Sequence, residues 1–189
     1  MPRSGSVQES DVMNDYEIKS YIMKKWGIKG FFHFTDIRNI PSIKERGLLP
    51  KRDLDDLSIG FTAVSNGWSQ DADLYRGLDA FVHLCFRDNH PMAFARQGCN
   101  TIVFLTISCN VMFYDNVLFT NDISNKRGVE PFSIDEFENK IDCEVLFHQT
   151  DWRNRQIHER LTKAEKSEIL IPRPISVEEI TFPSYLNNG

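Results

Sequence analysis

Two polar side chains share one face of an expected strand early in the chain. Residues 31–35 form an aromatic, β-prone run that carries His33 and Thr35 with one phenylalanine between them. Because side chains alternate along a strand, these two point to one surface, while Phe32 and Phe34 point to the other. A strand histidine is more often structural than functional, so this pair alone does not establish a site.

A carboxylate far along the sequence is the third group of interest. Glu168 opens the otherwise apolar strand of residues 168–171, where a buried and unpaired carboxylate would be costly. It either faces solvent at a strand edge or performs chemistry. Glu165 is a nearby competitor, but the lysines that flank its segment favour a solvated surface.

Several familiar chemistries lack their motifs. The sequence contains no G-x-x-x-x-G-K-[ST] and no G-x-G-x-x-G, so neither usual nucleotide cradle is supported. There is no H-E-x-x-H, no Cys/His set with zinc spacing and no G-x-S-x-G. We therefore expect no metal.

The composition favours one soluble domain. The 189 residues, 41% of them hydrophobic and 12% aromatic, are enough to bury a core, and we expect a single domain over residues 1–189 with residues 1–10 flexible. The net charge of −5 means that any nucleic-acid contact must come from a local basic patch. Four widely spaced cysteines, the lack of a secretory signal and the lack of an apolar run of about 18 residues indicate a cytoplasmic protein that does not span a membrane.

The expected elements place His33 and Glu168 on strands. Helical periodicity predicts a helix over residues 11–26, and a second helix follows from residue 37, with Asp36 as its cap and Gly47 at its end. Residues 50–76 are predicted to be an irregular connection. A short helix is expected over residues 133–140, with Ser133 and Glu136 in capping-box spacing, and a charged surface helix or loop over residues 151–166. Strands are expected at residues 31–35, 80–86, 101–107, 168–172 and 180–183, and residues 117–119 are either a short strand or a turn. The fold class is α+β, with a mostly antiparallel sheet and helices toward the N-terminus.

Several segments, in order along the chain, resemble one known family. They are His33-Phe34-Thr35-Asp36-Ile37 with Asn39-Ile40 and Gly47-Leu48-Leu49, Asp79-Ala80-Phe81-Val82-His83-Leu84-Cys85-Phe86 with His90-Pro91-Met92, Val117-Leu118-Phe119-Thr120-Asn121-Asp122, and Lys166-Ser167-Glu168-Ile169-Leu170-Ile171. From about residue 31 to residue 183, the chain resembles the DarT group of nucleic-acid ADP-ribosyltransferases, the toxins of toxin–antitoxin pairs. Each motif alone is loose, but the ordered set is fairly specific.

The resemblance implies an ADP-ribosyltransferase-like fold with a split antiparallel sheet that binds NAD⁺. It implies that His33 and Thr35 hold the nicotinamide end and that Asn39 faces the nucleotide, although an Asn exposed to water is an equal alternative. An arginine upstream of the central strand is expected to bind NAD⁺ and the target base. Arg76 fits by order and Arg52 is the alternative, while either could be a solvated loop charge.

The same resemblance implies contacts to the target base. Trp68 and Tyr75, in the expected irregular loop, are predicted to stack on a splayed base, although Trp68 could equally anchor the loop on the core. Met92 belongs to the Pro-Met turn, and we count it among the residues that bind the substrate. The residues before that turn, Asp88-Asn89-His90, depart from the basic, aromatic stretch common in the family, which leaves the target nucleotide open.

The expected activity is transfer of ADP-ribose from NAD⁺ to a base of single-stranded nucleic acid. Glu168 would supply negative charge near the ribose and act as general base, and Arg76 would pair with a phosphate or clamp the base. Single-stranded DNA is the first choice of target and RNA the close alternative. A protein-modifying enzyme and a non-catalytic module that binds NAD⁺ or nucleic acid remain open. The family also implies an antitoxin partner, either a macrodomain that removes ADP-ribose or a protein that blocks the cleft.

Overall fold

The computed structural model describes residues 13–63, 74–89, 93, 101–148 and 151–186. Within this part of the chain, six strands form one sheet in the order β4-β5-β2-β1-β3-β6, and every neighbouring pair is antiparallel. The strands are β1 (Gly30–Asp36), β2 (Val82–Cys85), β3 (Ile102–Ser108), β4 (Leu118–Thr120), β5 (Glu168–Ile171) and β6 (Ile180–Thr181). The predicted α+β class with an antiparallel sheet is confirmed.

The sheet is split along its middle. β1 pairs with β3 over its whole length, from Gly30 opposite Ser108 to Asp36 opposite Ile102. Between β1 and β2, by contrast, the ladder holds the single pair of Phe32 and Cys85. β2 and β5 then pair along all of β2. The two halves of the sheet therefore separate beyond Phe32, and the gap lies between the strand that carries His33 and the strands that lead to Glu168.

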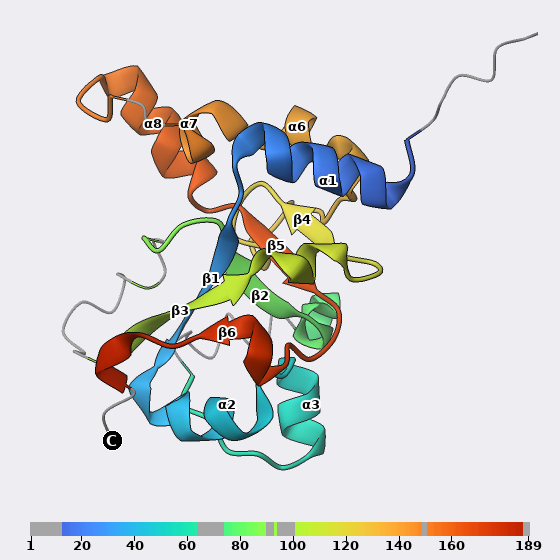
Figure 1. The fold of residues 1–189 in the computed structure, drawn as a ribbon, viewed down its shortest axis with the longest axis vertical. Coiled ribbons are helices and arrows are strands. Elements are labelled where there is room, and N and C mark those ends of the chain that lie inside the picture. The colour runs from blue at the N-terminus through green and yellow to red at the C-terminus, as the bar shows by residue number, and fades with distance from the viewer. Residues whose placement is uncertain (1–12, 64–73, 90–92, 94–100, 149–150, 187–189) are drawn as a thin grey trace, which may run out of the picture.

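Helices lie at both ends of the sheet (Figure 1). The α-helices are α1 (Asp15–Trp26), α2 (Ile40–Arg46), α3 (Lys51–Asp56), α6 (Phe137–Lys140), α7 (Cys143–Phe147) and α8 (Arg155–Ala164). The short 3-10 helices are η1 (Ile37–Asn39), η2 (Leu78–Ala80), η3 (Cys109–Phe113), η4 (Ile134–Glu136), η5 (Val177–Glu179) and η6 (Ser184–Leu186). Figure 1 shows α1, α6, α7 and α8 at one end and α2 with α3 at the other, and β1 runs from α1 to α2.

Caps set the two ends of α1. The Asn14 side chain accepts a hydrogen bond from the backbone N–H of Glu17, and the Glu17 carboxylate accepts one from the Asn14 N–H, which forms a capping box. The helix ends at Gly27, whose φ of 64° is a left-handed conformation that glycine adopts readily. The predicted helix is confirmed, and it begins a turn later than the apolar pattern suggests.

Asp36 turns the chain from β1 into the next helical segment. Its carboxylate accepts hydrogen bonds from the backbone N–H and the guanidinium of Arg38, and the guanidinium holds the pKa of the Asp36 carboxyl well below its usual value. The predicted cap is confirmed, although η1 precedes α2. At the far end of α2, Gly47 has a φ of 79°, and a Cβ there would lie 2.1 Å from the carbonyl oxygen of Ile175. Only glycine fits this close approach.

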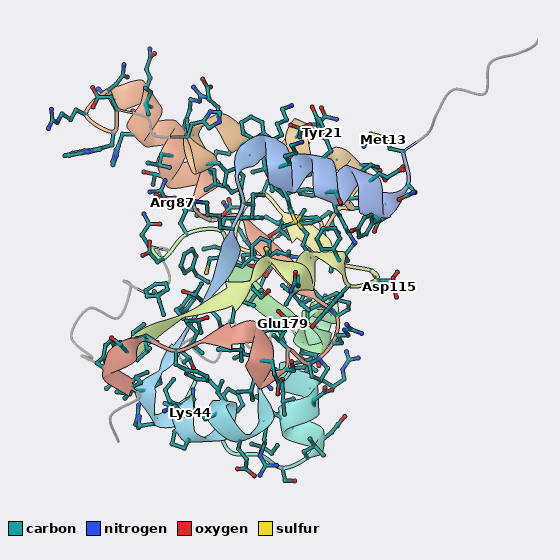
Figure 2. All side chains as sticks on the ribbon, viewed as in Figure 1. Met13, Tyr21, Lys44, Arg87, Asp115 and Glu179 are labelled. Atoms are coloured by element: carbon teal, nitrogen blue, oxygen red, sulfur yellow. The ribbon has the colours of Figure 1, made fainter. Side chains whose placement is uncertain are left out.

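One hydrophobic core stabilises the sheet. Phe31, Leu105, Ile107, Ile169 and Ile171, from strands β1, β3 and β5, have no exposed surface. Ile22 of α1 and Phe137 of α6 belong to the same cluster, and side chains fill the space between sheet and helices (Figure 2). Burial of this apolar surface supplies the main driving force for bringing the strands together. The split is therefore a local feature of a packed sheet.

Some details of the local predictions were wrong. Residues 50–76 are not irregular throughout, because α3 occupies Lys51–Asp56. The helix expected at residues 133–140 is present as η4 followed by α6, but its predicted capping box is absent, since the Ser133 side chain makes no cap and its Oγ lies 3.4 Å from Asp135 Oδ2. Helices are also not confined to the N-terminal part of the chain, since α6, α7 and α8 follow β4.

Candidate active site

A pocket of about 240 Å³ lies at the split in the sheet. β1 contributes His33 and Thr35, β2 contributes residues 82–85, and β5 contributes Glu168. Residues 60–63 and 123–125 complete part of the wall. The residues that the sequence placed on two distant strands thus line one pocket, with β2 between their strands.

His33 fills part of the gap where the ladder between β1 and β2 stops. Its Nδ1 lies 3.0 Å from the carbonyl oxygen of His83 on β2. A carbonyl oxygen only accepts, so Nδ1 carries the proton and donates. Burial lowers the pKa of His33 to about 4, against an ordinary value of 6.5. The ring is therefore neutral at neutral pH, and its Nε2 is an acceptor.

Thr35 and Asn39 both line the pocket and form a hydrogen-bonded pair in its wall. Thr35 is buried, and its Oγ accepts a hydrogen bond of 3.0 Å from the Asn39 side-chain amide. The same amide donates to the carbonyl of Thr62, and the Asn39 Oδ1 accepts from the Thr62 N–H at 2.7 Å. Asn39 therefore fixes the pocket wall at residues 60–63 to β1, rather than standing in open water.

Glu168 is buried at the start of β5. Only 6% of the residue is exposed, and in the ladder it stands opposite Cys85 on one side and Thr120 on the other. Its Oε2 accepts a hydrogen bond of 2.9 Å from the backbone N–H of Ser124. Burial and the Glu168 carboxylate together raise the pKa of the Cys85 thiol well above its ordinary value. The thiol therefore stays protonated beside the carboxylate.

Two neighbours of Glu168 were not predicted to be site residues. His83 Nδ1 lies 3.2 Å from Ser124 Oγ and 3.6 Å from Glu168 Oε2. His83 stands in a segment that carries the family resemblance, and Ser124 follows the matched turn at Phe119-Thr120-Asn121-Asp122 by two residues. Position next to these motifs was thus the only signal in the sequence, and it assigned neither residue a role.

The two candidate arginines bind other groups. Arg76 does not line the pocket, because its guanidinium donates to the carbonyls of Ser124, Lys126 and Val129 and lies 3.6 Å from Glu130 Oε1. Its contact with NAD⁺ stays a prediction, and it would require the guanidinium to leave these partners.

Arg52, the alternative, makes a two-point bond with Asp79. Its Nε lies 3.2 Å from Asp79 Oδ2 and its Nη2 lies 3.0 Å from Oδ1. Asp79 is a buried carboxylate that lines the pocket. Arg52 therefore holds α3 to the pocket wall at η2, and a contact with NAD⁺ would require it to exchange this partner.

Two of the three residues predicted to bind the substrate lie outside the described part of the chain. Trp68 and Met92 belong to segments that the structure does not describe. Tyr75 is described and is 93% exposed, directly before Arg76. Its ring therefore presents its surface to solvent, and its role in binding a base stays a prediction.

The described residues provide neither a metal cluster nor a membrane span. Over these ranges, no group of three or more His, Cys, Asp and Glu side chains could hold a metal ion. No helix among them is both long enough and apolar enough to cross a bilayer.

A family model matches most of the chain. It is described as DarT, the ssDNA thymidine ADP-ribosyltransferase, and it matches residues 32–182. Those residues run from β1 through β6 and include every described residue of the pocket. No curated protein matches the chain significantly.

Several solved structures of similar fold are of proteins named DarT or DarTG. Thermosipho africanus DarTG in complex with ADP-ribose has a TM-score of 0.62 at 19% identity, over 81% of this chain and 43% of that one. Thermus sp. 2.9 DarT in complex with ADP-ribosylated ssDNA has a TM-score of 0.61 at 16% identity, over 84% and 83%. The same Thermus protein in complex with NAD⁺ has a TM-score of 0.57 at 17% identity, over 81% and 79%. The chain thus spans less than half of the Thermosipho chain and about four fifths of the Thermus chain, and at these identities the likeness concerns the fold.

Proposed function

The chain belongs to the DarT family of ssDNA thymidine ADP-ribosyltransferases, and from this membership we propose that its pocket binds NAD⁺ and transfers ADP-ribose to a thymidine of single-stranded DNA. NAD⁺ is the donor substrate, and the reaction uses no metal. The Thermus proteins of similar fold are in complex with NAD⁺ and with ADP-ribosylated ssDNA, the donor and the product of this reaction.

The observation that carries the proposal is the buried carboxylate of Glu168 in the pocket that His33 and Thr35 also line. Burial of a carboxylate costs folding free energy, and carboxylates held in such environments cluster at functional sites. In ADP-ribose transfer the carboxylate has a chemical role, because positive charge develops on the ribose as nicotinamide leaves. A carboxylate held in a site shielded from water stabilises such charge more strongly than one in solution.

The chemistry breaks one bond and forms another. The bond between ribose C1′ and the nicotinamide nitrogen breaks, and nicotinamide departs as a neutral molecule with the electron pair. The thymine ring nitrogen that bears a proton then bonds to C1′, and that proton passes to Glu168 as general base. Proton and charge balance, since NAD⁺ and thymidine give nicotinamide, ADP-ribosylated thymidine and one proton.

His33 and Thr35 are proposed to orient the donor. The neutral ring of His33 uses its Nδ1–H for the His83 carbonyl, so its Nε2 can accept from a ribose hydroxyl or from the nicotinamide carboxamide. Asn39 is proposed to hold the pocket wall that faces the donor, through its hydrogen bonds to Thr35 and Thr62. Tyr75, Trp68 and Met92 are proposed to contact the base, and Arg76 or Arg52 the donor once it exchanges its present partners.

An antitoxin is the proposed partner in the cell. The Thermosipho protein of similar fold is a DarTG, a longer chain of which this one spans 43%. We propose that a protein which removes ADP-ribose, a macrodomain hydrolase, or one that blocks the pocket restrains the enzyme in the cytoplasm, where NAD⁺ and DNA meet.

Labelling with radioactive NAD⁺ tests the proposed function. Single-stranded DNA with thymidine, the same DNA with every thymidine replaced by cytidine, the corresponding RNA and a protein extract are each incubated with the purified chain. We expect label on the thymidine-containing DNA alone. Label on RNA or on protein would move the assignment to that target, and binding of NAD⁺ without any transfer would favour a non-catalytic module.

A further inference from the structure

His83 and Ser124 join two parts of the pocket. His83 lies on β2, in the middle of the split, and Ser124 lies in the turn that follows β4, with only 1% of the residue exposed. Ser124 bonds Glu168 through its backbone and His83 through its side chain. A single buried residue thus connects the carboxylate to the imidazole.

The direction of each bond follows from its partners. His83 Nε2 lies 3.0 Å from the carbonyl oxygen of Leu78, which only accepts, so Nε2 carries the proton. The other ring nitrogen, Nδ1, shares a hydrogen bond of 3.2 Å with Ser124 Oγ, which donates when Nδ1 is unprotonated and accepts when Nδ1 carries a proton. The Ser124 N–H donates to Glu168 Oε2 over 2.9 Å. Ser124 thus bonds both His83 Nδ1 and Glu168 Oε2, which stand 3.6 Å apart and form an ion pair when the ring is protonated.

The backbone of His83 extends this chain of bonds across the split. The His83 carbonyl accepts from His33 Nδ1, on the strand at the other side of the gap. Residue 83 therefore binds the His33 ring through its carbonyl and the Ser124 hydroxyl through its own ring. Connected hydrogen bonds of this kind hold one arrangement more firmly than isolated bonds do.

We propose that His83 and Ser124 are positioning residues for transfer: the hydrogen bond from Ser124 to His83 fixes the turn after β4, and the Ser124 amide then aims the Glu168 carboxylate at the ribose. This inference rests on the proposed function and adds to it which residues hold the carboxylate in place. A bond from a backbone amide to a carboxylate is charge-assisted, so its alignment matters more than that of a neutral bond. Placement of a charged group to within a fraction of an ångström decides how well it stabilises a transition state.

The first variant to test is Ser124→Ala. It removes the hydroxyl and keeps the backbone N–H, so the turn loses its anchor while Glu168 keeps its donor. We expect kcat for transfer to thymidine-containing DNA to fall roughly 3- to 10-fold, the cost of one buried hydrogen bond. The KM for NAD⁺ should stay within about twofold, because Ser124 is proposed to act on the carboxylate and not on the donor's binding.

Two substitutions at His83 separate the ring's two nitrogens. His83→Asn keeps an acceptor near the position of Nδ1, and His83→Gln keeps a donor near the position of Nε2. If His83 acts through its bond to Ser124, the Asn variant can keep that bond and the Gln variant cannot. We therefore expect a higher kcat for the Asn variant than for the Gln variant. The double variant with Ser124→Ala and His83→Gln should cost no more than the larger single effect, since both remove the same bond.

Matched controls come from exposed residues of the same types. Ser133→Ala and His148→Gln alter side chains that lie outside the pocket, and we expect wild-type kcat and KM for both. Thermal unfolding confirms that each variant is folded. If neither His83 variant folds, the Ser124→Ala measurement decides alone.

The possible results separate this inference from the proposed function. A wild-type kcat in Ser124→Ala, a rise in KM with kcat unchanged, or a Gln variant more active than the Asn variant would each overturn the positioning role. If the wild type transfers ADP-ribose and Glu168→Gln does not, those results leave the proposed function intact. A wild type that transfers nothing would overturn both.

Discussion

Replacement of His33 by asparagine removes an ionisable ring and keeps an N–H near the position of Nδ1. In the wild type, that N–H donates to the His83 carbonyl, and burial lowers the pKa of the ring to about 4 from an ordinary value of 6.5. The variant can retain the hydrogen bond but cannot take up a proton. It therefore isolates the effect of protonation on stability.

The size of this effect follows from proton linkage. Between the two pKa values the unfolded chain binds more protons than the folded one, so stability falls as the pH drops through this window. From the two values, the wild type should lose about 2 kcal/mol between about pH 7 and pH 5, and about 3 kcal/mol by pH 4. Asp36, Asp122 and Asp142, whose pKa values are lowered, affect stability only at a more acidic pH. Their contribution to stability is lost only as the pH falls below the ordinary carboxyl pKa of 3.8.

Urea denaturation at a series of pH values measures this loss. We expect the stability difference between wild type and His33→Asn to shrink by about 2 kcal/mol from about pH 7 to pH 5. His148→Asn, at an exposed histidine outside the pocket, supplies the control for loss of a side chain of the same type. Parallel curves for the wild type and His33→Asn would refute the claim that the ring of His33 is neutral in the folded protein at pH 5.

Two further predictions concern the parts that shape the pocket. Gly47→Ala would bring a Cβ to 2.1 Å from the Ile175 carbonyl oxygen and should lower the free energy of unfolding by roughly 3 kcal/mol or more. Gly27→Ala is the control, because Gly27 also has a positive φ but open space around it, and it should cost about 1–2 kcal/mol. Equal losses for the two variants in urea denaturation would argue against the close approach. Asn39→Ala leaves the N–H and carbonyl of Thr62 without their partner. We therefore expect the free energy of unfolding to fall by about 1–3 kcal/mol and the KM for NAD⁺ to rise roughly 5- to 10-fold. An unchanged KM in steady-state kinetics would show that this wall does not touch the donor.

Strand patterns were the part of the fold that the sequence predicted best. β1, β3 and β5 match their predicted ranges to within one residue at each end, because β-branched and aromatic runs leave little choice of structure. α3 was missed since residues 51–56 contain one apolar residue, Leu54, and show no helical period. That helix depends on tertiary and charge contacts: the Lys51–Asp55 pair and the bond from Arg52 to Asp79.

The site was predictable only where local chemistry is unusual. Glu168 stood out because a carboxylate begins an apolar strand, and His33 because it interrupts an aromatic run. Ser124 gave no such signal, since a serine in a turn is ordinary, and its bond to Glu168 spans 44 positions of sequence. Arg76 was chosen by its position along the chain. That position does not determine where a long side chain points, and in the structure the Arg76 guanidinium bonds the carbonyls of Ser124 and Lys126.

The central claim is that the Glu168 carboxylate performs the transfer. The most direct measurement compares the rate of ADP-ribose transfer to thymidine-containing single-stranded DNA in Glu168→Gln and Glu165→Gln at saturating NAD⁺, with NAD⁺ binding measured in parallel. Glu165 is a matched control because it lies outside the pocket, where it pairs with Arg87 and Asn89. We predict that Glu168→Gln loses at least about 100-fold in rate, the typical contribution of a general base, while it still binds NAD⁺, and that Glu165→Gln stays near wild type. A Glu168→Gln enzyme within tenfold of the wild-type rate would contradict the account.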